Sequence, residues 1–445
     1  MKVSAVDRER LAGLAQGELT AEERRRVVRH LLALSREGSR SAEPAKPREA
    51  GAARTSTGQA PRAEIEEIRL SERARGLLQE HVRVPELLER LDGLSAGERR
   101  ALVRIDRDLQ SLPLGQRLAE CCHDLVYAEA ARAEELAETV IALSQELDVR
   151  HYGAGLVNDF KACAWACLGE VLRSRADLRG AEVAFTVADS LLALGTGDVL
   201  EEERLIELEA LLRRDQNRLE EAHGLLDDVI EVYRQYRDFH LVGRALVHKG
   251  SVFGAANDFE PAARWLRKGL GLIDPTRERR LELSARHSLM LYLHESGRDQ
   301  EAWFLLKASR PEFVEHGGEL LNLRLRWLEG KIQQALGHLA EAEHALVESH
   351  RGFLEQGAGF SAALVCLDLA GLYAGQSRAV EMRRIAEEML PIFQSRDIHR
   401  EAIAALIVFQ QAVRMEKLSS DLLDEIRSFL RRARTDHKLR FEYSV

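Results

Sequence analysis

Five residues with side chains suited to metal binding lie in two short stretches of the chain. Cys121, Cys122 and His123 are consecutive, and Cys163 and Cys167 are one helical turn apart. Thiolates and imidazoles are the usual ligands of tetrahedral zinc, so a metal site is one interpretation. The other is core packing, because cysteine is small and apolar enough for a helix interface. We favour packing, and we expect no metal and no other cofactor.

Motifs for other chemistry are absent from the sequence. There is no G-x-x-x-x-G-K-[ST] phosphate loop, no H-E-x-x-H zinc motif, no G-x-S-x-G nucleophile elbow and no strand pattern for a dinucleotide fingerprint. A helical chain without such motifs is more typical of a binding surface than of an enzyme. The prediction is therefore a non-enzymatic protein.

The elements around the second cysteine pair are expected to be two amphipathic helices. Trp165, Leu168, Gly169 and Leu172 share one helical face, and Ala181, Phe185 and Ala188 share another. A turn containing Asp177 and Gly180 separates them. A single hairpin of this kind cannot bury its own apolar face, so it should recur along the chain.

The hairpin recurs with a period of about 40 residues. Taking Ala181 as a marker, equivalent alanines stand at Ala222, Ala262, Ala302 and Ala342, with a weaker match at Met382. We expect a further hairpin before this series, at 115–148, and another after it, at 401–433. The composition agrees, with only 9 prolines and 5% aromatic residues in 445, so the prediction is an all-α protein.

The pattern Trp165-x2-Leu168-Gly169-x2-Leu172 followed by Ala181-x3-Phe185-x2-Ala188 resembles the tetratricopeptide repeat, and Lys249-Gly250-x2-Phe253 followed by Ala262-x3-Leu266 does too. The longer period is similar to the sensor domains of large bacterial transcription activators and peptide-responsive regulators. From about residue 115 onward the chain also resembles bacterial tetratricopeptide proteins that accompany regulatory modules. The resemblance implies a right-handed superhelical solenoid of helical hairpins with a concave binding groove.

The resemblance also implies which side chains line that groove, because in this family fixed positions of the first helix of each repeat point inward. Carried onto this chain, the positions include Glu170 and Glu295. The partner-binding residues that we predict are Arg173, Arg213, Arg214, Arg244, His287, His294, Arg324, Trp327 and Lys331. Two interpretations stay open: a solvated face rich in arginine, or a groove whose guanidinium groups bind an acidic peptide or protein segment.

Two physical expectations follow if the cations converge in the groove. Their mutual repulsion would favour the binding of an anionic ligand. Exchanging Arg244 and Arg324 for Glu would leave the stability of the fold nearly unchanged, because exposed charges contribute little to it. In addition, His287 and His294 would gain charge below pH ~6.5, which would strengthen the binding of an acidic partner.

The chain divides into four predicted segments: a small helical head at 1–34, a flexible linker at 35–64, a helical cap at 65–114 and the repeats at 115–445. The linker has no Leu, Ile, Val, Met or aromatic residue in its 30 positions, so it cannot bury enough apolar surface to fold. Within the head, residues 11–31 resemble the helical part of anti-sigma zinc-finger domains. His30 matches one metal ligand of that family, but no cysteine follows it, so the resemblance implies a degenerate domain without zinc.

Charge and hydropathy restrict the partners. The net charge is −9, of which residues 1–62 contribute +5 and the remainder −14. An acidic body argues against direct nucleic-acid binding. The longest apolar run, Ala402 to Phe409, is too short to cross a bilayer, so we expect a cytoplasmic protein. Our leading hypothesis is a bacterial scaffold that binds a protein or peptide and controls a sigma factor or another effector. The alternatives are a peptide- or ligand-sensing transcription regulator and, third, an enzyme subunit.

Overall fold

The structure is a computed structural model. It describes residues 79–126, 129–394 and seven isolated positions from 409 to 429. The chain divides into two compact units, 1–85 and 86–445, and nearly all the described residues belong to the second unit. None of the described residues is in a strand, which confirms the all-α prediction. The head, the linker and most of the hairpin expected at 401–433 lie outside the described residues.

A short helical region precedes the repeats. It consists of α4 (Ala96–Ile105), the 3-10 helix η1 (Arg107–Leu109), α5 (Leu112–Leu125), α6 (Ala130–Glu146) and α7 (Val149–Tyr152). Helix α4 begins with a capping box, in which the Ser95 hydroxyl and the Glu98 carboxylate each accept a bond from the other residue's backbone N–H. Helices α5 and α6 pack as the hairpin that the sequence predicted at 115–148.

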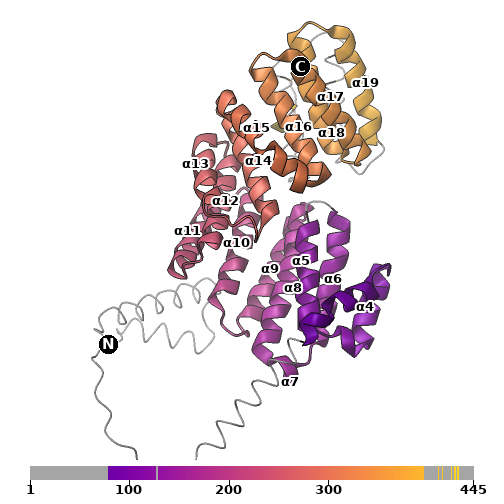
Figure 1. Ribbon diagram of the computed structural model, residues 1–445, viewed down its shortest axis with the longest axis vertical. Coiled ribbons are helices and arrows are strands. Elements are labelled where there is room, and N and C mark those ends of the chain that lie inside the picture. The colour runs from indigo at the N-terminus through magenta and orange to yellow at the C-terminus, as the bar shows by residue number, and fades with distance from the viewer. Residues whose placement is uncertain are drawn as a thin grey trace, which may run out of the picture. The chain divides into compact units, whose positions relative to one another are not determined.

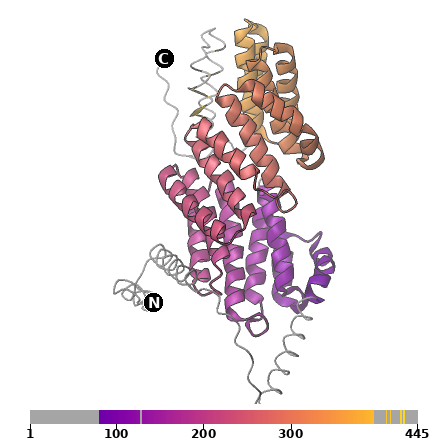
Figure 2. The ribbon, with the colours of Figure 1, turned by 60° about the vertical axis from the view of Figure 1, so that its left-hand side comes forward.

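Residues 154–394 form six antiparallel helical hairpins in series (Figure 1). The hairpins are α8 (Ala154–Ser174) with α9 (Leu178–Leu192), α10 (Val199–Asp215) with α11 (Leu219–Gln235), α12 (Phe239–Ala255) with α13 (Phe259–Leu270), α14 (Arg279–Glu295) with α15 (Asp299–His316), α16 (Gly318–Ala335) with α17 (Leu339–Glu355), and α18 (Gly359–Gly375) with α19 (Ala379–Gln394). Each helix also packs against the next helix along the chain, so the hairpins form a continuous solenoid (Figure 2).

The turn inside each hairpin has one left-handed residue at a constant position. These residues are Ala176, Asn217, Asn257, Gly297, Gly337 and Ser377, with φ between 58° and 83°. The following N–H bonds back to a carbonyl five residues earlier, as from Asp258 to Phe253 and from Arg298 to Leu293. This is the Schellman arrangement, which satisfies the last carbonyls of the first helix and reverses the chain. Its 40- to 41-residue spacing sets the period that the alanine markers indicate.

The seam between the two helices of a hairpin depends on a small residue facing a large one. All five marker alanines are fully buried, at 0% exposure. A Cβ atom added at Gly169 would lie 2.4 Å from Cε1 of Phe185, and one at Gly330 would lie 2.7 Å from Cγ of Leu346. The small residues therefore permit close helix packing, as the tetratricopeptide resemblance implies.

The last described hairpins carry the most apolar packing. Helix α18 is buried along almost its whole length, and Leu367 and Leu369 are completely covered. Phe409, Val413 and Ile426 belong to the same cluster, so apolar positions of the segment after α19 pack on this end of the solenoid. Among the described helices, none has the length and apolar character needed to cross a membrane.

Candidate functional site

The first helix of each hairpin packs against the first helix of the next hairpin, so α8, α10, α12, α14 and α16 form one layer of the solenoid. We call the side of this layer that carries the polar side chains described below the inner face. Arg280 at the start of α14 donates a hydrogen bond to the backbone carbonyl of Asp124 in α5. This contact joins residues 156 positions apart, so the inner face brings together parts of the chain that are distant in sequence.

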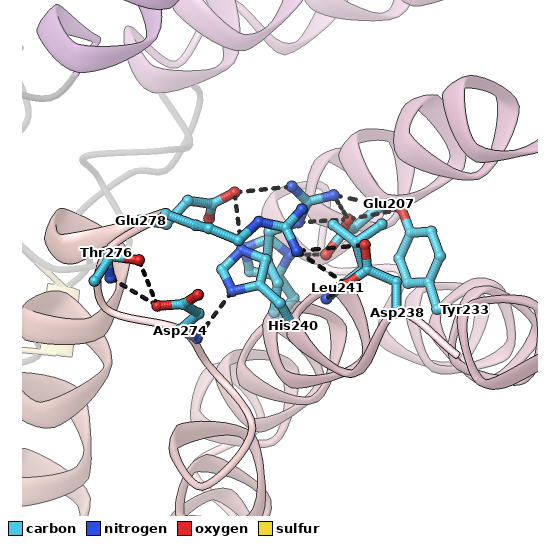
Figure 3. A network of polar contacts seen from close by, with 11 residues as sticks. Glu207, Tyr233, Asp238, His240, Leu241, Asp274, Thr276 and Glu278 are labelled. Carbon is cyan, nitrogen blue, oxygen red and sulfur yellow. Dashed lines mark hydrogen bonds and ion pairs between the residues drawn. The ribbon is translucent and has the colours of Figure 1, made fainter. Parts of the chain in front are cut away.

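The centre of the inner face is a network of polar contacts that includes Glu207, Tyr233, His240 and Glu278 (Figure 3). It is built around Arg244. The Nη2 and Nε atoms of this arginine lie 2.8 and 3.0 Å from Oε2 of Glu207, and its Nη1 lies 3.0 Å from Oε1 of Glu278. Arg244 stands on α12, Glu207 on α10 and Glu278 just before α14. One guanidinium group therefore links three successive hairpins, because its planar fork can bind two carboxylates at once.

Two histidines and a tyrosine complete this network. Nδ1 of His248 lies 2.8 Å from Oε1 of Glu207, and the Tyr233 hydroxyl donates to the same carboxylate over 3.3 Å. His240 accepts a bond from the Asp274 N–H at Nδ1, so its proton is on Nε2, which faces Glu278 at 3.5 Å. Burial alone would raise the pKa of Glu207, but the Arg244 cation and the contacts with His248 and Arg244 outweigh it and hold the pKa at about 2.

A second network lies on α5, α8 and α10. Nη1 of Arg173 lies 2.6 Å from Oδ2 of Asp215, whose other oxygen binds Arg214. Arg214 also donates to the Ser251 hydroxyl over 2.9 Å. His123 lies 3.3 Å from Glu170; burial opposes the ionisation of Glu170, yet His123 and Arg173 lower its pKa to about 2. The Glu170 charge in turn raises the pKa of His123.

The remaining predicted residues also have partners or lie elsewhere. Lys331 binds Glu295 at 2.8 Å, and Nε1 of Trp327 donates to Asp368 over 2.6 Å. His294 binds Asp299. Arg213 binds Glu182 of α9 and Gln216, so it lies between the helices of adjacent hairpins and apart from the inner-face networks.

The sequence predicts that cations converge and repel one another on the inner face, but the structure pairs most of these cations with carboxylates. Arg173, Arg214, Arg244 and Lys331 each bind a carboxylate, so attraction within these pairs replaces the expected repulsion. Whether the nine predicted residues bind a partner stays a prediction.

Two physical expectations about individual residues are wrong. The Arg244 side chain is only 12% exposed and its partner Glu207 only 2%, so Arg244 is not a surface charge that can be exchanged freely. His287 does not charge below pH ~6.5, because burial lowers its pKa to about 4 despite a hydrogen bond with the Arg324 backbone.

Sequence reasoning missed three acids of these networks, Glu207, Asp215 and Glu278, and one cation, Arg204. Glu207, Asp215 and Arg204 stand at the same positions of α10 that contribute His287, Glu295 and Arg324 in later hairpins. The 40-residue period could have found them. Glu278 lies just before a helix, outside the family's groove positions, so only the structure places it beside Arg244.

The cysteines line a pocket between α5, α8, α9 and α10. Cys122, Cys163 and Cys167 lie in its wall together with Glu170 and Arg204. A hydrogen bond with Cys167 and burial raise the pKa of Cys163, and contact with Cys122 and burial raise that of Cys167 to about 12. They are therefore thiols at neutral pH and poor metal ligands. Within the described part of the chain, no His, Cys, Asp and Glu side chains converge in an arrangement that could hold a metal ion.

Comparisons with known proteins identify the fold. No protein-family model and no curated protein matches the chain. Among solved structures, a Rap protein complexed with competence and sporulation factor is similar to this chain, with 12% sequence identity and a TM-score of 0.53. The match covers 72% of this chain and 87% of the Rap protein. A second similar structure is a signal transduction ATPase with numerous domains from Pyrococcus horikoshii, which has a tetratricopeptide repeat sensor. It is 14% identical to this chain, with a TM-score of 0.53. This chain spans about half of that protein, 51%. The chain is therefore an all-α solenoid of tetratricopeptide-like hairpins.

Proposed function

We propose that the chain is a non-enzymatic regulatory scaffold that binds a protein or peptide segment along its inner face. The observation that carries this proposal is the row of charged side chains on successive first helices, which the apolar core does not require. Repeat proteins use such extended surfaces for binding. The similar structures support it, because one has a repeat domain described as a sensor and the other is a complex with a factor.

The bound segment is acidic in this proposal. Arg204, Arg280 and Arg324 are more exposed than Arg244, so an incoming carboxylate reaches their guanidinium groups first. Exposed cations bind carboxylates by charge-assisted hydrogen bonds that weaken as salt screens them. Trp327, with part of its ring accessible, supplies an apolar contact beside them.

The finer version of this function rests on the head at residues 1–34. Its resemblance to an anti-sigma zinc-finger helix supports control of a sigma factor or a similar transcription component, with the solenoid holding a second partner. A peptide- or ligand-sensing transcription regulator is the alternative, and an enzyme subunit is the third. These versions differ in the partner they require.

The test begins with affinity capture from native lysate, which returns partners for calorimetry with the purified full-length chain. Exchanging Arg280 and Arg324 together for Glu should weaken binding by about 2 kcal/mol, because two attractive contacts become repulsive. Arg264→Glu, on the exposed side of the outer helix α13, is the matched control and should change the affinity little. Equal affinity of the double variant and the wild type would contradict binding at the inner face.

A further inference from the structure

The pocket beside the thiols has features that the scaffold function does not require. It encloses about 30 Å³ of free space, enough for one or two water molecules or small groups. Its floor is apolar, because Ala162, Ala166 and Leu205 line it. The small side chains of α8 leave this space open, where a larger residue at position 166 would close it.

Arg204 differs from the other cations on the inner face. Its side chain is exposed and lines the same pocket. Among the described residues, no hydrogen bond or ion pair involves its guanidinium group, whereas Arg173, Arg214 and Arg244 all bind carboxylates. A guanidinium group at a pocket wall offers its hydrogen-bond donors to whatever enters.

Two acids that line the pocket, Glu170 and Glu201, act on the Arg204 charge without forming an ion pair with it. Glu170 also lines the pocket, but it is bound by His123. Glu201, one turn earlier on α10, is close enough to favour the charge of Arg204 but forms no ion pair with it. The Arg244 cation acts in the opposite direction. The site thus has a positive charge without a bound counter-ion.

The thiols of Cys122, Cys163 and Cys167 line the same pocket. A hydrogen bond with Cys167 and burial raise the pKa of Cys163, and contact with Cys122 and burial raise that of Cys167, so both present S–H groups at neutral pH. Such groups are weak donors on an otherwise apolar surface. They tolerate an aliphatic group against them and do not repel an anion as thiolates would.

We infer that this pocket binds a carboxylate with a short aliphatic chain, which places the carboxylate on the exposed Arg204 and only the end of the chain, about one or two carbon atoms, between Ala166 and Leu205. The source of that chemistry is either a small free acid or the C-terminal residue of a peptide. This inference does not depend on the acidic partner proposed above, because the pocket can be tested with small molecules alone.

The experiment is calorimetric titration of the full-length chain with butyrate, with butyramide and butylamine as neutral and cationic analogues. N-acetylvaline and its amide form the peptide arm, because they differ only in the free terminal carboxylate. We expect a carboxylate to bind and its uncharged analogue to fail. Binding of butyrate alone identifies a free acid, and binding of N-acetylvaline identifies a peptide terminus.

Two variants locate the site. Arg204→Gln should weaken carboxylate binding by about tenfold or more, because it removes a charge-assisted contact. Ala166→Leu should abolish binding by filling the pocket while it leaves Arg204 in place. Arg264→Gln on α13 is the control and should keep the wild-type affinity. If neither carboxylate binds at millimolar concentration, or if Arg204→Gln binds as the wild type does, the inference is wrong.

Discussion

The hairpin seams and the inner face lie on the same helices but differ in the residues that they carry. At the seams, small and large apolar residues alternate at a fixed period, and the marker alanines are fully buried in five successive hairpins. On the inner face, the same helices carry Glu207 and Lys331 at positions that change type from hairpin to hairpin, although Arg204, Arg244 and Arg324 share one position. The seam residues recur because every hairpin needs the same close backbone approach. The inner-face residues vary because each must match only its local partners.

The strongest test of this contrast is a comparison within the inner face. Arg244→Glu places a carboxylate beside the buried Glu207 and removes its partner, so it should lower the free energy of unfolding by about 5 kcal/mol. Arg324→Glu, at the equivalent position two hairpins later and exposed, should lower it by less than about 1 kcal/mol. Urea denaturation of both variants measures the difference. Similar losses would show that burial does not separate these two arginines.

A deletion at the seam should have a nearly equal effect. Phe185→Ala removes the ring that packs over Gly169 and leaves a cavity, so the loss should be about 3 to 5 kcal/mol. Phe304→Ala is the control, because that ring is 72% exposed. A small loss for Phe185→Ala in urea denaturation would mean that the helices close over the cavity.

Overfilling the seam should cost less than emptying it. Ala262→Leu forces a larger side chain against Gly250 and its surroundings, so we expect a loss of about 1 to 3 kcal/mol. Ala255→Leu makes the same change at an exposed position of α12 and should leave the thermal midpoint nearly constant. An unchanged midpoint for Ala262→Leu would contradict the seam register.

The smallest expected effect is a pH dependence on the inner face. Burial lowers the pKa of His287 to about 4, and the charges of Arg324 and Lys331 act in the same direction. Between pH 6.5 and pH 4 the unfolded chain therefore binds a proton that the folded chain does not, and stability falls as the pH falls. From pH 7 to pH 5.5 this amounts to about 1 kcal/mol.

His287→Gln should remove that part of the slope in urea denaturation performed at both pH values. The carboxylates of Glu170 and Glu207 titrate below this range, since each has a pKa of about 2. Their contribution is present above the unfolded pKa of about 4.5 and is lost only as the pH falls toward 2. Identical slopes for the wild type and His287→Gln would contradict the assignment to His287.

The helical-hairpin architecture could be predicted from the sequence alone. The recurrence of Ala181, Ala222 and Ala262 at 40- or 41-residue spacing predicts the hairpins, because helix–helix contact requires small residues at fixed points of the backbone. The capping box at Ser95 could also be predicted, since it depends on neighbours that are near in sequence.

The electrostatic interactions of the inner face could not be predicted without the tertiary structure. The register indicates that Arg244 stands on this face, but it does not indicate that Glu278 from a later hairpin neutralises it, nor that Arg204 has no counter-ion among the described residues. Likewise, the depressed pKa of His287 follows from burial by neighbouring helices. Helical periodicity gives the direction in which a side chain points, whereas its charge state depends on the atoms that it meets there, and these come from other parts of the chain.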